Sequence, residues 1–203
     1  MTTAVRPAAA ADVPAAAGVL ADAFSDDPLM SSIWPDPSDR TRALPGYFAT
    51  SLRRFHLPAG GVSLAADSGG AVAAVAVWDP PGQWQRSLLS TIRAAPALLA
   101  AMRTRLPAAL AISRALEAHY PPQPAWCLVN LGSTTVHRGR GHAARLVEQQ
   151  LRHCDREAVP AWLVCTRESN ITYYQRFGFT VTEKFQLPAG AKPPMWAMTR
   201  EPR

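Results

Sequence analysis

The sequence is poor in lysine and has no long apolar run. Lysine occurs only at Lys184 and Lys192, so the net charge of +6 comes almost entirely from arginines scattered from Arg6 to Arg203. Scattered arginines do not form the continuous basic stripe that follows a nucleic-acid backbone, so we do not expect nucleic acid as a partner. No apolar segment reaches membrane-spanning length, and the alanine-rich start lacks the basic beginning and apolar centre of a secretory signal. We therefore expect a cytoplasmic protein that does not contact membranes.

Cysteine and histidine are also sparse, and their spacing excludes two common kinds of site. Cys127, Cys154 and Cys165 form no CxxC pair and no even disulfide framework, which is typical of a reducing compartment. The five histidines show no HExxH-type spacing, so no metal site is predicted. With 203 residues, of which 48% are hydrophobic, the chain is long enough to bury one core. We expect a single domain over residues 1–203.

Apolar periodicity, glycines and prolines predict alternating helices and strands, hence an α/β or α+β fold. In the first half of the chain we expect a strand at 3–8, a helix at 11–24 capped by Asp12, a loop at 25–39, a helix at 40–55 capped by Asp39, a hairpin at 61–81 with Gly69 and Gly70 at its turn, and two or three short helices at 84–118 interrupted by Pro96 and Pro107. In the second half we expect a strand at 124–133, a helix at 141–159, a strand at 161–169, a short helix at 170–177 capped by Asn170, and antiparallel strands at 177–187 and 193–201. The strand, helix and strand at 124–169 predict a parallel crossover.

The segment VHRGRGHAARL, residues 136–146, predicts an anion site at the start of a helix. Gly139, Gly141 and Ala143 leave backbone N–H groups uncovered where Leu146 begins an apolar helical stripe. Those donors and the positive end of the helix dipole face one point, an arrangement that suits phosphate.

Two phosphate-binding templates fit this glycine-rich loop. Gly139, Gly141 and Ala144 satisfy GxGxxA, the dinucleotide fingerprint. Too few residues follow the loop to build further strand and helix units, and they end in an antiparallel pair, so this context does not fit a dinucleotide domain. The Walker motif is excluded because no GK[ST] follows. The second template, Q/R-x-x-G-x-G/A, is met by Arg138, Gly141 and Ala143.

Together with the hairpin at 61–80, LVNLGS, RGRGHA and NITYYQRFGF, this loop resembles the GNAT superfamily of N-acetyltransferases. Within the superfamily the chain is similar to the puromycin N-acetyltransferase branch in VRPAAAADVPAAAGVLADAF, AVAVWDPPG, PAWCLVNLG, VPAWLVCTRESNITYYQRFGFTV and LPAGAKPPMWAMTRE. The resemblance is strongest from Pro124 to Arg200. It implies a mixed, mostly antiparallel sheet flanked by helices, with two parallel strands splayed around a cleft for acetyl-CoA. The residues expected to bind acetyl-CoA are Leu131, Gly132, Ser133, Arg138, Gly139, Arg140, Gly141, His142, Ala143, Ala144 and Asn170.

The resemblance also suggests groups that move protons during acetyl transfer. Tyr174 matches the family tyrosine in its spacing from Asn170, so we expect it to protonate the departing thiolate. His119 precedes a proline-rich turn where relatives also carry a histidine, and its unperturbed pKa near 6.5 suits a base acting through water. Glu117 is an alternative base, and no base is needed if the amine arrives neutral.

Acidic and aromatic residues flank the expected acceptor mouth. Asp26, Asp27, Trp34, Trp78 and Trp84 can hold a cationic, aromatic amine, although each tryptophan also suits the core. The sequence therefore predicts an N-acetyltransferase that transfers acetyl directly to a primary amine of a small, antibiotic-like molecule. The alternatives are a protein N-acetyltransferase, a non-catalytic acyl-CoA sensor and a nicotinamide-dependent reductase. We expect a monomer or a homodimer.

Overall fold

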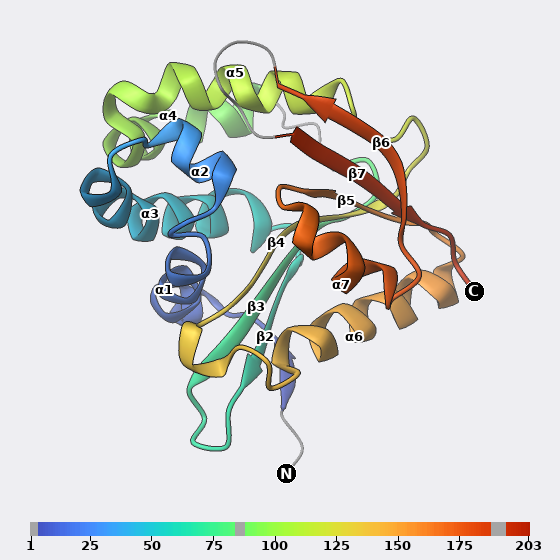
Figure 1. Ribbon diagram of the computed structural model, residues 1–203. Helices are drawn as coiled ribbons and strands as arrows, with labels where there is room; N and C mark the ends of the chain where they lie inside the picture. The colour runs from blue at the N-terminus through green and yellow to red at the C-terminus, as the bar shows by residue number, and fades with distance from the viewer. Residues whose placement is uncertain (1–3, 84–87, 188–193) are drawn as a thin grey trace.

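A mixed seven-stranded sheet lies between two layers of helices in the computed structural model, which describes residues 4–83, 88–187 and 194–203 (Figure 1). The strand order is β1-β2-β3-β4-β5-β7-β6. Every neighbouring pair is antiparallel except β4 and β5, which run parallel. The strands are β1 (Val5–Pro7), β2 (Val62–Ala66), β3 (Val72–Asp79), β4 (Trp126–Ser133), β5 (Ala161–Cys165), β6 (Thr180–Gln186) and β7 (Pro194–Arg200). This architecture confirms the expected mixed, mostly antiparallel sheet, including the hairpin of β2 and β3.

Helices cover both faces of the sheet. The helices are α1 (Val13–Ala23), α2 (Pro28–Ile33), α3 (Pro37–Ser51), α4 (Leu88–Met102), α5 (Leu106–Glu117), α6 (His142–Glu157) and α7 (Ile171–Gln175). Figure 1 shows α6 and α7 on one side of the sheet and α1, α3, α4 and α5 on the other. Side chains alternate between the faces, as they must in a strand. In β3, Val75 and Val77 join the core beneath α1 and α3, whereas Ala76 and Trp78 join the core beneath α6.

Three expectations in the first half of the chain are wrong. The segment expected as a loop contains α2, whose N-cap is Asp27, and α3 begins earlier than expected, with Asp36 as its N-cap. Asp39 lies in the first turn of α3, where its N–H donates to the Asp36 carboxylate at 2.7 Å. Both helices start at an Asp-Pro pair, in which the carboxylate caps the helix and proline takes the first position.

The third expectation concerned the prolines. Helix α4 runs through Pro96 without a break, so the expected interruption there does not occur, whereas Pro107 lies in the first turn of α5, where proline is tolerated. Asp12 does precede α1, but its carboxylate pairs with Arg6 and accepts the N–H of Ala9 instead of bonding to the first turn of α1.

Among the described residues, no helix is both long enough and apolar enough to cross a bilayer.

Candidate active site

Strands β4 and β5 separate where the glycine-rich loop begins. Their parallel pairing ends at Leu128 opposite Leu163, although β4 continues to Ser133 and β5 to Cys165. At the same level β4 contains a bulge: Leu128 lies opposite Trp78 and Asn130 opposite Val77, so Val129 is the extra residue. The bulge and the loss of pairing together open a gap between the two parallel strands, as expected from the sequence.

The edge of β4 offers backbone groups to this gap. The N–H of Thr134 donates to the carbonyl of Ala73 at 3.2 Å, which extends the ladder between β3 and β4. Hydrogen-bonding directions alternate along an antiparallel strand, so Gly132 bonds toward β3, whereas Leu131 and Ser133 direct their backbone groups toward the gap. Gly132 has a packing role, because a Cβ there would lie 2.7 Å from Cβ of Ala23 in α1.

The loop that follows β4 presents unpaired donors. Gly139 and Gly141 have φ values of +75° and +81°, which favour glycine, and Gly141 is the N-cap of α6. Within the described part of the chain, five backbone N–H groups of this loop and of the first turn of α6 have no hydrogen-bond acceptor. They belong to Arg138, Gly139, Gly141, Ala143 and Ala144. These donors meet the positive end of the α6 dipole, so the segment is suited to bind an anion in both geometry and electrostatics.

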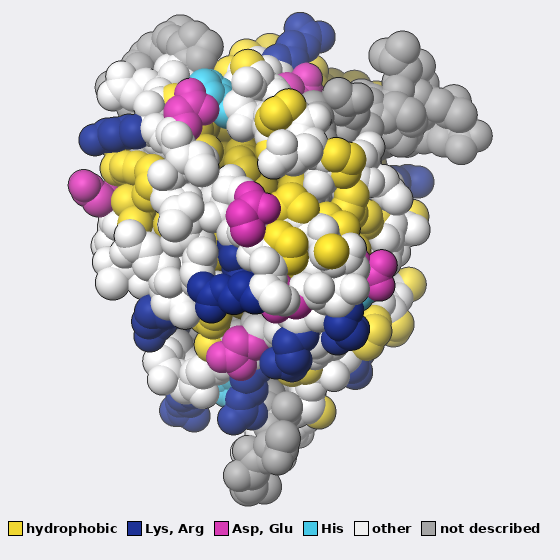
Figure 2. All heavy atoms as spheres, turned by 90° about the vertical axis from the view of Figure 1, so that its right-hand side faces the viewer, with side chains coloured by type: hydrophobic (Ala, Val, Ile, Leu, Met, Phe, Trp, Pro, Cys, Tyr) yellow, Lys and Arg dark blue, Asp and Glu magenta, His cyan; other side chains and the backbone are white. Residues whose placement is uncertain are grey.

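Arginines add positive charge around these donors. Arg138, Arg140 and Arg145 are exposed, and none of them belongs to an ion pair among the described residues. Figure 2 views the side of the molecule at which α6 ends in Figure 1, and further Lys and Arg side chains lie on the lower half of that face. Exposed, unpaired guanidinium groups are suited to bind phosphate oxygens in pairs.

His142 is the first residue of α6 and is buried beneath the loop, with its ring edge-on to His137 at 5.6 Å. Burial lowers the pKa of His142, and the neighbouring His137, Arg145 and Arg140 lower it further, against the smaller opposing effect of Asp67. The imidazole is therefore held neutral at physiological pH.

Tyr174 lies in α7 and packs into the core beneath α6, edge-on to Phe179 at a centroid distance of 6.1 Å. Its hydroxyl has no hydrogen-bond partner in the described part of the chain. Burial raises the pKa of Tyr174 well above its usual range, with smaller contributions from Cys165, Tyr173 and Asp27. The Tyr174 hydroxyl is therefore protonated at neutral pH. Asn170 ends the short turn before α7 and is exposed.

Tyr173, the neighbour of Tyr174, points elsewhere. The Arg176 guanidinium lies over its ring, 4.8 Å from the centroid, and its buried hydroxyl has no hydrogen-bond partner among the residues that the structure describes. Burial raises the pKa of Tyr173 to about 12.

The aspartates expected at the acceptor mouth already have partners. One Asp27 oxygen accepts the N–H groups of Leu29 and Met30 at 2.9 and 3.1 Å, and the other accepts the Thr166 hydroxyl at 2.6 Å. Asp26 pairs with Arg167 at 3.1 Å. Together these contacts tie the start of α2 to the segment between β5 and α7.

The tryptophans expected at the mouth are core residues where the structure describes them. Trp34 is 3% exposed and packs edge-on against Tyr47, and Trp78 is 1% exposed in the core beneath α6. Trp84 lies outside the described residues.

His119 follows α5 and has an acidic partner that the sequence did not suggest. Its Nδ1 lies 3.0 Å from the Glu183 carboxylate of β6, and its ring stacks on Phe185 at a centroid distance of 3.7 Å. Because a carboxylate cannot donate, Nδ1 carries the proton and Nε2 is the basic nitrogen. Glu117, the alternative base, is exposed at the end of α5.

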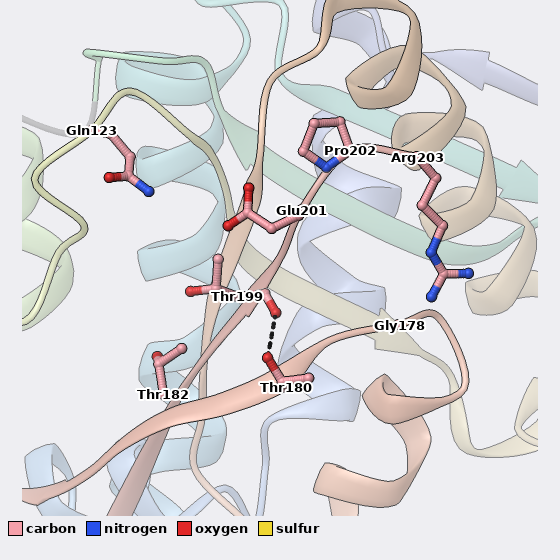
Figure 3. Close-up of a pocket in the computed structure, with 8 residues that line it drawn as sticks. All are labelled: Gln123, Gly178, Thr180, Thr182, Thr199, Glu201, Pro202 and Arg203. Atoms are coloured by element: carbon pink, nitrogen blue, oxygen red, sulfur yellow. Dashed lines mark hydrogen bonds between the residues drawn. The ribbon is translucent and has the colours of Figure 1, made fainter.

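A shallow pocket of about 450 Å³ lies away from these residues (Figure 3). It is lined by Gln123, the start of β6 and the end of β7, where the Thr180 hydroxyl donates to the Thr199 carbonyl at 3.3 Å. Since Thr199 pairs with Trp162 near the start of β5, the pocket is at the opposite end of the parallel strands from the glycine-rich loop. It contributes no group to the candidate site.

The fold is that of the GNAT superfamily of N-acetyltransferases. The chain superposes on a Corynebacterium glutamicum protein named histone acetyltransferase HPA2 and related acetyltransferase, with a TM-score of 0.78, 24% identity, and coverage of 100% of this chain and 98% of that one. It also superposes on the Drosophila melanogaster polyamine N-acetyltransferase, which forms N-acetylagmatine (TM-score 0.67, 15% identity, 98% and 100% coverage). A third match is the GNAT superfamily phosphinothricin acetyltransferase of Sinorhizobium meliloti in complex with AcCoA (TM-score 0.58, 16% identity, 99% and 89% coverage). At these identities the similarity establishes the fold.

Sequence comparison gives a shorter match. An uncharacterised N-acetyltransferase of Schizosaccharomyces pombe is 32% identical over 78 residues, which make up 38% of this chain. The chain spans about a third of that relative's length, since the match covers 32% of it. No protein-family model matches the chain.

Proposed function

We propose that the protein is an acetyl-CoA-dependent N-acetyltransferase that acetylates a primary amine of a small molecule by direct transfer. The observation that carries the proposal is the run of unpaired amides from Arg138 to Ala144 beside the gap between β4 and β5. The amides, the α6 dipole and the exposed arginines suit a pyrophosphate. The backbone edge at Leu131 and Ser133 suits a chain that carries amides of its own, as pantetheine does. The match to a GNAT acetyltransferase solved with AcCoA supports the same cofactor.

Acetyl-CoA supplies an activated acetyl group as a thioester, so the protein must position the amine and move two protons. His119 takes a proton from the incoming ammonium at Nε2, directly or through water, while Glu183 holds the ring in orientation. Tyr174 gives its proton to the departing thiolate, and the second proton that the nitrogen loses as the amide forms restores the Tyr174 hydroxyl. His119 thus removes the one proton in excess, and no phenolate remains. Glu117 is the second candidate for the base.

Direct transfer is favoured because the cysteine at the end of β5 is a poor nucleophile. Cys165 ends β5, and its thiol donates to the carbonyl of Arg167 at 2.9 Å. Burial raises the pKa of Cys165, so the reactive thiolate is suppressed. Cys165 is therefore not suited to form a covalent acetyl-enzyme intermediate.

The acceptor we propose is a small cationic amine. The carboxylate that supplies an accessible negative charge is Glu183, which is exposed beside His119. Asp27 and Asp26 are bound to the start of α2 and to Arg167. A cationic amine is attracted to such a site, and a relative of the same fold acetylates agmatine. An antibiotic-like amine fits the same chemistry, and protein N-termini are the second class of acceptor.

The test is release of free CoA from acetyl-CoA across a panel of amines. The panel contains agmatine, spermidine, an arylalkylamine, puromycin and short peptides with free N-termini, and mass spectrometry identifies the acetylated product. We expect release with at least one small amine and little with the peptides. A parallel melting experiment compares acetyl-CoA with NADPH, because a ligand that binds only the native state raises the melting temperature.

The outcomes separate the alternatives. Stabilisation by acetyl-CoA without turnover of any amine would identify a sensor, and turnover of the peptides alone would identify a protein N-acetyltransferase. Stabilisation by NADPH alone would identify a nicotinamide-binding protein.

A further inference from the structure

Two aspartates from distant parts of the chain hold the first half of the glycine-rich loop. Asp22, near the end of α1, accepts the backbone N–H of Thr135 at 2.6 Å through one carboxylate oxygen. Its other oxygen accepts the Thr135 hydroxyl at 3.1 Å. The two residues are 113 positions apart in the sequence, so only the folded chain brings them together. Thr135 is thus fixed through both its backbone and its side chain.

The second aspartate, Asp67, is in the turn between β2 and β3. One of its oxygens accepts the N–H groups of Gly69 and Ala71, both at 2.9 Å, which fixes the turn itself. The other oxygen lies 3.1 Å from Nε2 of His137. The opposite ring nitrogen of His137, Nδ1, lies 2.7 Å from the Thr134 hydroxyl. With the proton on Nε2, the ring donates to Asp67 and accepts from Thr134, so both ring nitrogens are used.

These contacts divide the loop into two halves with different functions. Residues 134–137 are bound on one side to α1 and on the other to the turn of the hairpin, and Figure 1 shows the segment between these two elements. Residues 138–144 carry the unpaired amides. In the glycine-rich loop, Asp22 and Asp67 form hydrogen bonds only with residues 134–137, so the amides of residues 138–144 stay available to a ligand.

Electrostatics alone does not explain two carboxylates at this place. A negative charge beside an anion site repels phosphate. Asp67 carries such a charge, because the backbone N–H groups of Ala71 and Gly69, together with His137, lower its pKa and keep it ionised. Their presence is therefore unfavourable for anion binding unless the geometry that they impose is worth more than the repulsion.

The loop needs such an imposed geometry. Gly139 and Gly141 sample many backbone conformations when they are not held, and only some of those conformations align the amides on one point. If the aligned conformation is a minor state, the apparent affinity falls in proportion to its population. Hydrogen bonds that fix one end of the loop raise the population of the aligned conformation before the ligand binds.

We propose that Asp22 and the Asp67–His137 pair are positioning residues that pre-organise the glycine-rich loop for the pyrophosphate of acetyl-CoA. The proposal rests on the proposed function, since it takes the loop as the pyrophosphate site. Asp22, Asp67 and His137 act through the loop and do not touch the reacting atoms. Their removal should therefore change the affinity for CoA and leave the chemical step nearly unchanged.

The experiment compares two substitutions of Asp22, with binding of CoA measured by calorimetry and turnover measured with the best amine. Asp22→Ala removes both contacts, and we expect the Kd for CoA and the KM for acetyl-CoA to rise about 10- to 100-fold, as expected if the aligned loop becomes a state of about 1–10%. The value of kcat should change less than about threefold. Asp22→Asn keeps both contacts, because its amide oxygen accepts the Thr135 N–H and its amide N–H donates to the hydroxyl. This variant should bind CoA like the wild type.

A matched control and a second site sharpen the test. Asp36→Ala removes another carboxylate that accepts a backbone N–H at 2.7 Å, but at α3, so it should leave the Kd unchanged. His137→Phe keeps an aromatic ring, loses both ring hydrogen bonds and should weaken CoA binding as Asp22→Ala does. Melting curves of all variants report folding.

The possible results are distinguishable. Unchanged affinity in Asp22→Ala overturns the proposal, and so does tighter binding in both Asp22 variants, which would mean that charge dominates. Equal losses of kcat and affinity would assign Asp22 a general structural role and also overturn it. If the wild type itself does not bind CoA, it is the proposed function that fails.

Discussion

Gly141 offers a sharp test of the anion site because the chain contains a matched glycine elsewhere. Gly141 has φ +81° and Gly60, in the turn before β2, has φ +70°. A Cβ built on either residue meets no atom within 4 Å. Gly141→Ala and Gly60→Ala therefore impose comparable backbone strain and no clash, but only Gly141 lies among the unpaired amides.

The magnitudes follow from this geometry. An alanine in the left-handed region costs about 1–2 kcal/mol, which for a chain of this size lowers the melting temperature by roughly 2–8 °C. We expect this loss in both variants. In Gly141→Ala the local backbone also rotates toward negative φ, and the new methyl group enters the space above the donors. Loss of one charge-assisted hydrogen bond to phosphate, about 1.5–3 kcal/mol, corresponds to a rise in Kd of about 10- to 150-fold.

The assay is calorimetric titration with CoA, accompanied by melting curves of the free proteins. Gly141→Ala should lose affinity by this factor, whereas Gly60→Ala should bind like the wild type despite a comparable loss of thermal stability. If Gly141→Ala binds CoA normally, the phosphates lie elsewhere. If both variants lose affinity equally, the effect comes from folding and the reasoning about the loop is refuted.

Three further predictions concern buried titratable groups. Tyr174→Phe removes one hydroxyl and should lower kcat about 100- to 10,000-fold with little change in the Kd for CoA, and turnover at the wild-type rate would remove Tyr174 from the mechanism. Because burial lowers the pKa of His142, the unfolded state binds the proton first, so the contribution of His142 to stability is present above its unfolded pKa near 6.5 and is lost as the pH falls below that value. Melting curves should show a weaker pH dependence in His142→Gln, and an unchanged dependence would contradict this. Burial raises the pKa of Cys127 to about 12, so peptide mapping after treatment with a thiol reagent at pH 8 should find Cys127 modified only after unfolding.

The fold could be predicted where its determinants are close in sequence. The hairpin of β2 and β3 has two β-compatible runs and a glycine turn within twenty residues, and the crossover through α6 has the same local character. The unexpected starts of α2 and α3 are also marked locally in the sequence. Asp27-Pro28 and Asp36-Pro37 each combine an N-cap with a proline at the first helical position, which indicates a helix start as strongly as any pair of residues can.

The candidate site was predictable in part for the same reason. The amides of residues 138–144 are contiguous, so the sequence shows them together. Asp22 and Thr135 are 113 positions apart, and His119 and Glu183 are 64 apart. No local pattern relates such pairs, because their contact depends on the order of strands in the sheet and on the packing of α1 and α5 against it.

The role of Asp27 shows why a residue at a predicted mouth need not bind the acceptor. Asp27 is only 6% exposed, and a buried carboxylate is costly unless its oxygens accept hydrogen bonds. Helix α2 and Thr166 supply those bonds, so the carboxylate stabilises the acceptor-side segment rather than presenting a free charge. Glu183 differs, because its side chain is 47% exposed while it holds His119. An accessible carboxylate can approach a substrate ammonium without first breaking the contacts that maintain the fold. Discrimination between cationic and neutral amines should therefore depend more on Glu183 than on Asp27.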